Sequence, residues 1–160
     1  MGCDIHLLYQ KQINGHWQSV RVKNNPTAVY SDGPLEGRNY TIFAFLAGVR
    51  NYDAIKPIAE PRGLPSDLND ETFAQECEDY GHTPSWLSID ELLKYDYEQE
   101  TENRRVARQI APNITHGGCT RGPGEGVIQP LAEYLGLWFF VDLLCLHRAG
   151  VERIVFCFDN

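Results

Sequence analysis

Apolar and polar positions alternate in the first segment of the chain. Over residues 3–12, the two sides of an extended segment carry Cys3, Ile5, Leu7 and Tyr9, and Asp4, His6, Leu8 and Gln10. This period of two predicts a β-strand that begins almost at the first residue. Asn14-Gly15 follows, and both residues tolerate the positive φ of a tight hairpin turn. We therefore expect an antiparallel hairpin whose second strand covers residues 16–22.

Helical spacing appears in three later segments. In RNYTIFAFLAGVRN the apolar side chains fall on one face, which predicts a helix that ends near Asn51. Ser88-Ile89-Asp90-Glu91 has the form of a capping box and predicts a helix through residue 95. Residues 130–147 are apolar at helical spacing and predict the main buried helix, which Gly150 ends. Residues 67–80 are acidic and only weakly helical in pattern.

The closing segment VERIVFCFDN is a continuous apolar run, which is typical of a central strand. Together the elements predict an α+β fold: an antiparallel sheet built from the N-terminal hairpin and the C-terminal strand, packed by helices on one face. The length of 160 residues predicts a single domain, residues 1–160. Residues 96–126 fit no clear element, and a loop, a lid, a dimer arm and an insertion remain alternatives for them.

The composition is that of a globular chain, with 42% hydrophobic and 22% charged residues. No apolar run reaches the length of about 18 residues that a membrane span needs, and no basic segment followed by an apolar stretch opens the chain. Five cysteines without a CxxC pair favour reduced thiols over a disulfide framework. We therefore expect a cytoplasmic protein without membrane partners.

The formal net charge of −8 argues against a partner such as duplex nucleic acid, because phosphate neutralisation needs clustered Lys and Arg. The net charge is compatible with a small anion that a few arginines hold. Arg38, Arg50 and Arg62 each lie at the boundary of a predicted element, next to Tyr40, Asn51 and a glycine. Their guanidinium groups could converge on a phosphate, or they could cap helices and pair with acids.

Asp4 and His6 lie two apart on the predicted first strand, so both project from one face with Cβ atoms roughly 6–7 Å apart. Such a pair could share a metal, a water or a ligand, or it could be a polar edge that faces water. His82, His116 and Cys119 are candidate partners in a metal site, but no spacing matches a known zinc pattern. Cys3 points the other way and is expected in the core.

Two further segments carry candidate chemistry. GHTPSWLSIDEL places His82, Ser85 and Trp86 just before a helix. A Ser–His nucleophile is disfavoured because nothing resembles a nucleophile elbow, and Trp86 is either a stacking surface or a buried residue. GGCTRGPGEG precedes a helix and could bind an anion through backbone N–H groups, although a surface loop is the better interpretation.

The blocks MGCDIH, RNYTIFAFLAGVRN, PRGLPSD, GHTPSWLSIDEL and RIVFCFDN resemble a family of small uncharacterised bacteriophage and prophage proteins. The resemblance extends over most of the chain except residues 96–126. It implies a small protein made in the cytoplasm of an infected bacterium. Several such families are counter-defence proteins, which either sequester or cleave the nucleotide second messengers of host immunity.

These observations favour a protein that sequesters a phosphorylated, nucleotide-like ligand such as an immune cyclic nucleotide, an anti-defence sponge. The alternatives are a metal-dependent phosphoesterase and an acidic protein that inhibits a host enzyme. No complete catalytic set is visible in the sequence, and no cofactor is expected. A divalent metal would be needed only for the esterase alternative. A homo-oligomer is compatible with the sequence. The expected ligand-binding residues are Asp4, His6, Arg38, Tyr40, Arg50, Asn51, Arg62, His82, Ser85 and Trp86.

Overall fold

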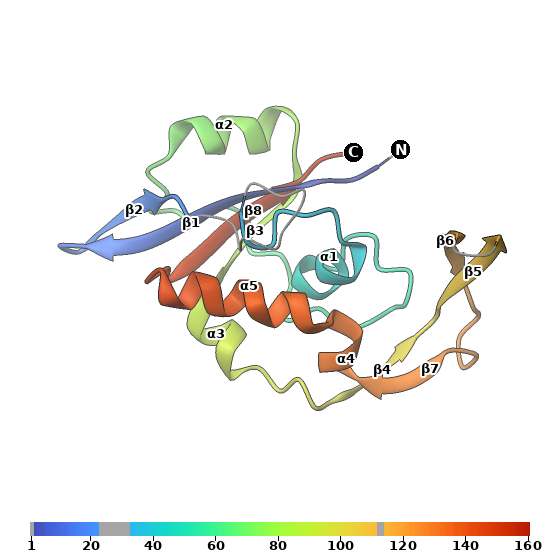
Figure 1. The fold of residues 1–160 in the computed structure, drawn as a ribbon. Helices are drawn as coiled ribbons and strands as arrows, with labels where there is room; N and C mark the ends of the chain where they lie inside the picture. Colours follow the sequence, from blue (N-terminus) through green and yellow to red (C-terminus); the bar gives the residue numbers. More distant parts are fainter. Residues whose placement is uncertain (1, 23–32, 112–113) are drawn as a thin grey trace.

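The computed structural model describes residues 2–22, 33–111 and 114–160, without the side chains of residues 106–120. Its centre is a four-stranded antiparallel sheet in the order β2-β1-β8-β3 (Figure 1). The strands are β1 (Ile5–Ile13), β2 (His16–Val20), β3 (His82–Ser88) and β8 (Arg153–Phe158). The α+β prediction, with the N-terminal hairpin and the last strand in one sheet, is confirmed.

The hairpin turn follows from its two residues. Asn14 and Gly15 have φ of 53° and 78°, the left-handed values that Asn and Gly accept most readily. β2 pairs with β1 from Tyr9 onward, where Tyr9 faces Val20. β8 pairs with β1 along its whole described length and with β3 on its other side, so β8 is buried at every position. The continuous apolar run at the end of the chain is therefore the central strand.

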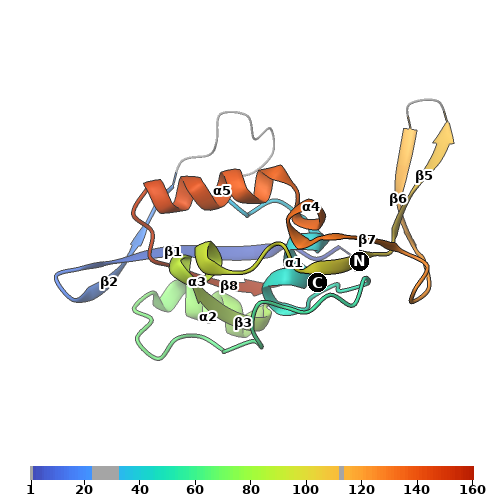
Figure 2. The same cartoon turned by 90° about the horizontal axis from the view of Figure 1, so that it is seen from below.

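Helices cover both faces of the sheet (Figures 1 and 2). One face carries the larger core, made with α1 (Tyr40–Ala47), α3 (Ile89–Lys94), α4 (Leu131–Leu135) and α5 (Leu137–Arg148). On the other face, α2 (Glu71–Asp79) packs Phe73 and Cys77 against β8. The sequence predicted helices on one face only. The second layer was not expected because only two side chains of α2 are buried, so the apolar pattern of this helix is weak. In the described part of the chain, no helix has the length and apolar character that crossing a membrane requires.

Two predicted helices have the boundaries that their caps dictate. The Asn39 side chain accepts from the N–H groups of α1, and Gly48 ends that helix in the left-handed conformation. Ser88 and Glu91 form the predicted capping box of α3. The single helix expected over residues 130–147 is instead two helices. Gly136, with φ 80° and ψ 164°, breaks the chain between α4 and α5.

The unassigned residues 96–126 contribute strands to two β-ribbons, with β4 (Glu100–Asn103) paired to β7 (Val127–Pro130) and β5 (Arg105–Ala111) paired to β6 (Ile114–Thr120). The β5–β6 ribbon projects from the body as an arm (Figure 2). β6 thus covers part of the glycine-rich segment that was expected to be a surface loop. Asp53, 2% exposed, holds the base of the arm by accepting from the Tyr134 hydroxyl at 2.6 Å, Arg105 Nε at 2.7 Å and the Arg104 N–H at 2.9 Å.

A disulfide links Cys77 of α2 to Cys157 of β8, with Cα atoms 5.9 Å apart. The expectation of reduced thiols is wrong for this pair. The two cysteines are 80 residues apart in sequence, and only the packing of α2 on β8 brings them together. Cys3 and Cys145 have free thiols, and the Cys119 side chain lies outside the described residues.

Candidate functional site

The N-terminal and C-terminal residues lie side by side at one edge of the fold (Figure 1). The Asp4 N–H donates to Asp159 Oδ1 at 3.0 Å, and the Asp159 N–H donates to the Asp4 carbonyl at 3.1 Å. The Cys3 N–H donates to the Tyr40 hydroxyl at 3.1 Å, which ties the first residues to α1. This arrangement follows from the antiparallel pairing of β1 with β8, which sets Ile5 opposite Phe158.

At this edge of the fold, the Arg38 guanidinium forms a bidentate ion pair with the Asp4 carboxylate. Arg38 Nε donates to Asp4 Oδ1 at 2.6 Å, and Arg38 Nη2 donates to Asp4 Oδ2 at 2.5 Å. The fork lowers the pKa of Asp4, and both side chains are about half exposed, 54% for Arg38 and 47% for Asp4. A Cβ at Gly2 would collide with the Arg38 guanidinium, so the glycine leaves the room that the guanidinium occupies.

His6 and Arg50 complete the group. His6 Nε2 lies 2.9 Å from Asp159 Oδ2, and this contact lowers the pKa of Asp159. Arg50 Nη2 donates to Asn160 Oδ1 at 3.0 Å, and its guanidinium lies 5.9 Å from the centroid of the Tyr40 ring. We call Asp4, His6, Arg38, Tyr40, Arg50 and Asp159 the terminal cluster.

A second tyrosine borders the terminal cluster. The Tyr52 ring lies edge-on to Tyr40, with centroids 6.4 Å apart, and is 49% exposed. The hydrogen bond that Arg50 donates to the Tyr52 hydroxyl raises the pKa of Arg50 above its ordinary value. Arg50 adopts φ 52°, a left-handed conformation in the turn after α1 that returns its side chain toward the chain ends. Five of the ten residues expected from sequence therefore meet here, together with an exposed aromatic ring.

Arg62 lies in a different environment. Its guanidinium forks onto Glu91, with Nη2 to Oε1 at 2.6 Å and Nη1 to Oε2 at 3.1 Å, and lies 4.8 Å from the centroid of the Trp86 ring. Arg62 therefore contacts none of the chain-end residues that Arg38 and Arg50 contact. The capping box with Ser88 holds the Glu91 carboxylate that pairs with Arg62.

The other expected residues have structural contacts. Ser85 is 2% exposed and its Oγ accepts from the Arg62 N–H at 3.1 Å, so the hydroxyl is already engaged. His82 stacks on Phe158 and has Nδ1 2.9 Å from Thr83 Oγ1. Asn51 clamps its own loop, accepting from the Ile55 N–H at 3.0 Å and donating to the Ile55 carbonyl at 2.7 Å. Among the described residues, His82 Nε2 is buried with no hydrogen-bond partner.

A metal site would need several converging ligands. In the described part of the chain, no group of three or more His, Cys, Asp and Glu side chains could hold an ion. Asp4 is engaged by Arg38, and His6 by Asp159. The side chains of His116 and Cys119 lie outside the described residues.

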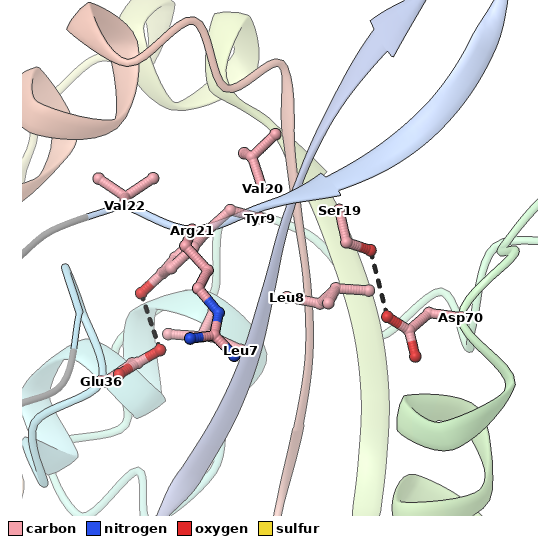
Figure 3. A pocket seen from close by; sticks show the side chains of 9 residues that line it. All are labelled: Leu7, Leu8, Tyr9, Ser19, Val20, Arg21, Val22, Glu36 and Asp70. Carbon is pink, nitrogen blue, oxygen red and sulfur yellow. Dashed lines mark hydrogen bonds between the residues drawn. The ribbon is translucent and has the colours of Figure 1, made fainter.

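Sequence reasoning missed a hollow of about 780 Å³ beside the β1–β2 hairpin (Figure 3). Tyr9 donates there to the Pro34 carbonyl at 2.7 Å and to Glu36 Oε1 at 3.0 Å, and Ser19 donates to Asp70 Oδ2 at 3.2 Å. None of the ten expected residues lines it. Its lining residues are Leu7, Leu8, Tyr9, Ser19, Val20, Arg21, Val22, Glu36 and Asp70. No sequence motif marks the hollow, because it forms where β2 stops pairing with β1.

Comparison of the chain with protein-family models, with curated proteins and with solved structures gave no match in any of the three. The resemblance to phage and prophage proteins stays a hypothesis that rests on the sequence blocks. The geometry of the terminal cluster is therefore the basis on which a function is argued.

Proposed function

We propose that the protein binds a phosphorylated, nucleotide-like small molecule at the terminal cluster and sequesters it unchanged. The observation that carries the proposal is that Arg38 and Arg50 each bond a residue at the hydrogen-bonded chain ends, Asp4 and Asn160, beside the exposed ring of Tyr52. Guanidinium forks match the oxygens of a phosphate, and an exposed aromatic ring can stack on a base.

The ligand enters by exchange of one anion for another. Asp4 occupies the Arg38 fork in the structure, as a phosphate oxygen pair would in the complex. Because the pair is exposed to water, its loss costs the protein little, and the phosphate replaces its charge. The ring of Tyr52 and the hydroxyl-bearing edge of Tyr40 then flank the ligand on the side of α1.

Sequestration fits the described side chains better than cleavage. The one serine among the expected residues is buried and engaged with the Arg62 backbone, and no described contact joins it to a histidine. An esterase would need a nucleophile or a converging set of metal ligands beside the arginines.

The biological setting follows from the sequence resemblance. We place the protein in a phage-infected bacterium, where removal of an immune second messenger would protect the phage. The Cys77–Cys157 disulfide is a point against a reducing cytoplasm, where such bonds are rare. The thiol state of the purified protein is therefore part of the test of this setting.

The test is a thermal-shift screen of the purified protein against cyclic dinucleotides, cyclic ADP-ribose isomers and mononucleotides, with chemical analysis of each compound afterwards. A ligand at a hundredfold excess over its dissociation constant should stabilise the fold by about 2.7 kcal/mol. A stabilising nucleotide recovered intact supports sequestration, and a consumed one supports the esterase. Stabilisation by none of them contradicts the proposal.

The acidic surface of α2 favours a second candidate function, inhibition of a host enzyme that binds nucleic acid. Every charged residue from Asp67 to Asp79 is an acid, and Glu76, Glu78 and Asp79 are exposed on α2. Such a surface can occupy a site built for phosphates. Reversal of Glu76 and Glu78 to Lys should abolish salt-sensitive inhibition of the enzyme and leave nucleotide binding unchanged; equal inhibition by the reversed variant would exclude this candidate.

A further inference from the structure

The outer face of α5 is apolar although it faces solvent. Leu137, Trp138 and Leu144 are 72%, 60% and 50% exposed. Leu137 and Leu144 are seven residues apart, with the partly exposed Val141 between them, so they form one stripe along the helix. An exposed Leu alone is unremarkable, but a stripe with a Trp at one end marks an interaction surface.

The inner face of α5 already supplies the contacts that the fold needs. Phe139, Leu143 and Leu146 are at most 2% exposed and belong to the main core. Asp142, the acid of the helix, accepts from the Leu35 N–H at 2.9 Å and is half-buried, so it adds no charge to the outer stripe. A helix that is apolar on both sides is typical of one that is covered on both sides.

The charges at the two ends of this face are opposite. Exposed His147 and Arg148 lie at the C-terminal end of α5, and exposed Glu133 lies in α4 just before its N-terminal end. Antiparallel packing of two copies sets Leu137 of one copy against Leu144 of the other. It also brings Arg148 toward the end that carries Glu133 of the partner. A two-fold interface requires such a self-complementary face.

We propose that the protein is a homodimer whose two copies pack their α5 helices antiparallel through Leu137, Trp138, Val141 and Leu144. The helix has 12 residues and is about 18 Å long, so the contact is small and we expect weak association. Val127 and Ile128, 55% and 60% exposed, belong to β7, the strand that leads into α4 (Figure 1). The interface is separate from the terminal cluster and does not depend on the ligand.

Sedimentation equilibrium of the full chain tests the dimer. We expect wild type to shift from the monomer mass of 18.2 kDa to twice that mass as its concentration rises through the micromolar range. Leu144→Arg should remain monomeric over the same range with an unchanged circular dichroism spectrum, since the side chain is half exposed. The matched control is Tyr80→Arg, which alters a 78% exposed residue next to α2, on the opposite face of the sheet, and should dimerise like wild type.

The antiparallel arrangement has its own test. Glu133→Arg should weaken dimerisation at least severalfold, and the double variant Glu133→Arg/Arg148→Glu should restore it, because the two charges exchange places across the interface. Wild-type protein that stays monomeric at several hundred micromolar would overturn the dimer. A dimer that Tyr80→Arg dissociates as strongly as Leu144→Arg would overturn the assigned face, and failure of the double variant to restore dimerisation would overturn the antiparallel packing.

Discussion

The role of Asp4 differs between sequence and structure. The sequence suggested a ligand contact, whereas the structure has the carboxylate in the fork of Arg38, which is where we propose that a phosphate binds. Asp4→Asn removes the competing charge and should tighten nucleotide binding about two- to fivefold, the range measured for exposed ion pairs. Titration calorimetry of wild type and variant with the same nucleotide measures the change. Weaker binding by the variant would mean that Asp4 contacts the ligand directly.

The Arg62–Glu91 pair gives a prediction about pH. The hydrogen bonds from Arg62 lower the pKa of Glu91 from its ordinary 4.5 to about 2. Because the folded state lowers this pKa, the carboxylate stabilises the fold fully above pH 4.5, and that stability is lost as the pH falls through 2. Glu91→Gln should therefore cost about 1–2 kcal/mol at neutral pH, with allowance for solvent screening of the 40% exposed carboxylate.

Urea unfolding at several pH values checks the prediction for Glu91. The gap in unfolding free energy between wild type and Glu91→Gln should narrow steadily below pH 4.5. A matched control is Asp90→Asn, whose carboxylate pairs with Lys94 at 2.8 Å with both side chains at least 70% exposed, and which should change stability little. A gap that stays constant down to pH 2 would contradict the role given to the ionised pair.

At the scale of elements, the β5–β6 arm depends on one buried carboxylate. Asp53→Ala leaves Arg105 Nε and the Tyr134 hydroxyl without their acceptor and should destabilise the fold by about 2–4 kcal/mol. The loss should be concentrated in β4 and β7, which join the arm to the body. Hydrogen exchange of these strands together with urea unfolding measures both effects. Unchanged exchange in β4 and β7 would show that other contacts hold the arm.

Elements with a local signal could be predicted from sequence, and elements that depend on distant contacts could not. The hairpin at Asn14-Gly15 and the capping box at Ser88 follow from residues that lie side by side in the chain. The ribbon of β4 and β7 joins segments separated by a whole hairpin, and no local pattern announces it. Gly136 divides one apolar run into two helices, which the continuous helical spacing conceals.

The candidate site likewise contains residues that the sequence could indicate and residues that depend on distant contacts. Asp4 and His6 could be chosen from sequence because they lie two apart on one strand face, and Arg38 because it lies at the boundary of a predicted element. Asp159 was not among the expected residues, because its part in the cluster depends on the pairing of β8 with β1. Arg62 pairs with an acid, one of the alternatives that the sequence left open, but its partner Glu91 could not be named because the two are 29 residues apart.

At the scale of the whole molecule, the Cys77–Cys157 disulfide holds α2 on the central strand. A bond that closes a loop of 80 residues restricts the unfolded chain by roughly 4–5 kcal/mol in the chain-entropy model. Reduction or Cys77→Ala should therefore lower the unfolding free energy by several kcal/mol and release α2 first, since few buried side chains attach it. Urea unfolding with and without reductant measures the loss. Thiol counting by mass spectrometry that finds every cysteine free in the unreduced protein would refute the bond.

The central claim is that Arg38 and Arg50 act together on one phosphorylated ligand. The most direct measurement is titration calorimetry of the nucleotide that stabilises wild type, repeated with Arg38→Ala, Arg50→Ala and the matched control Lys94→Ala. Each cluster variant should lose roughly 10- to 100-fold in affinity, as expected for a charged hydrogen bond, with the nucleotide recovered intact. Lys94→Ala removes an exposed cation of α3 and should bind like wild type. Affinities that are equal for all four proteins would contradict the account.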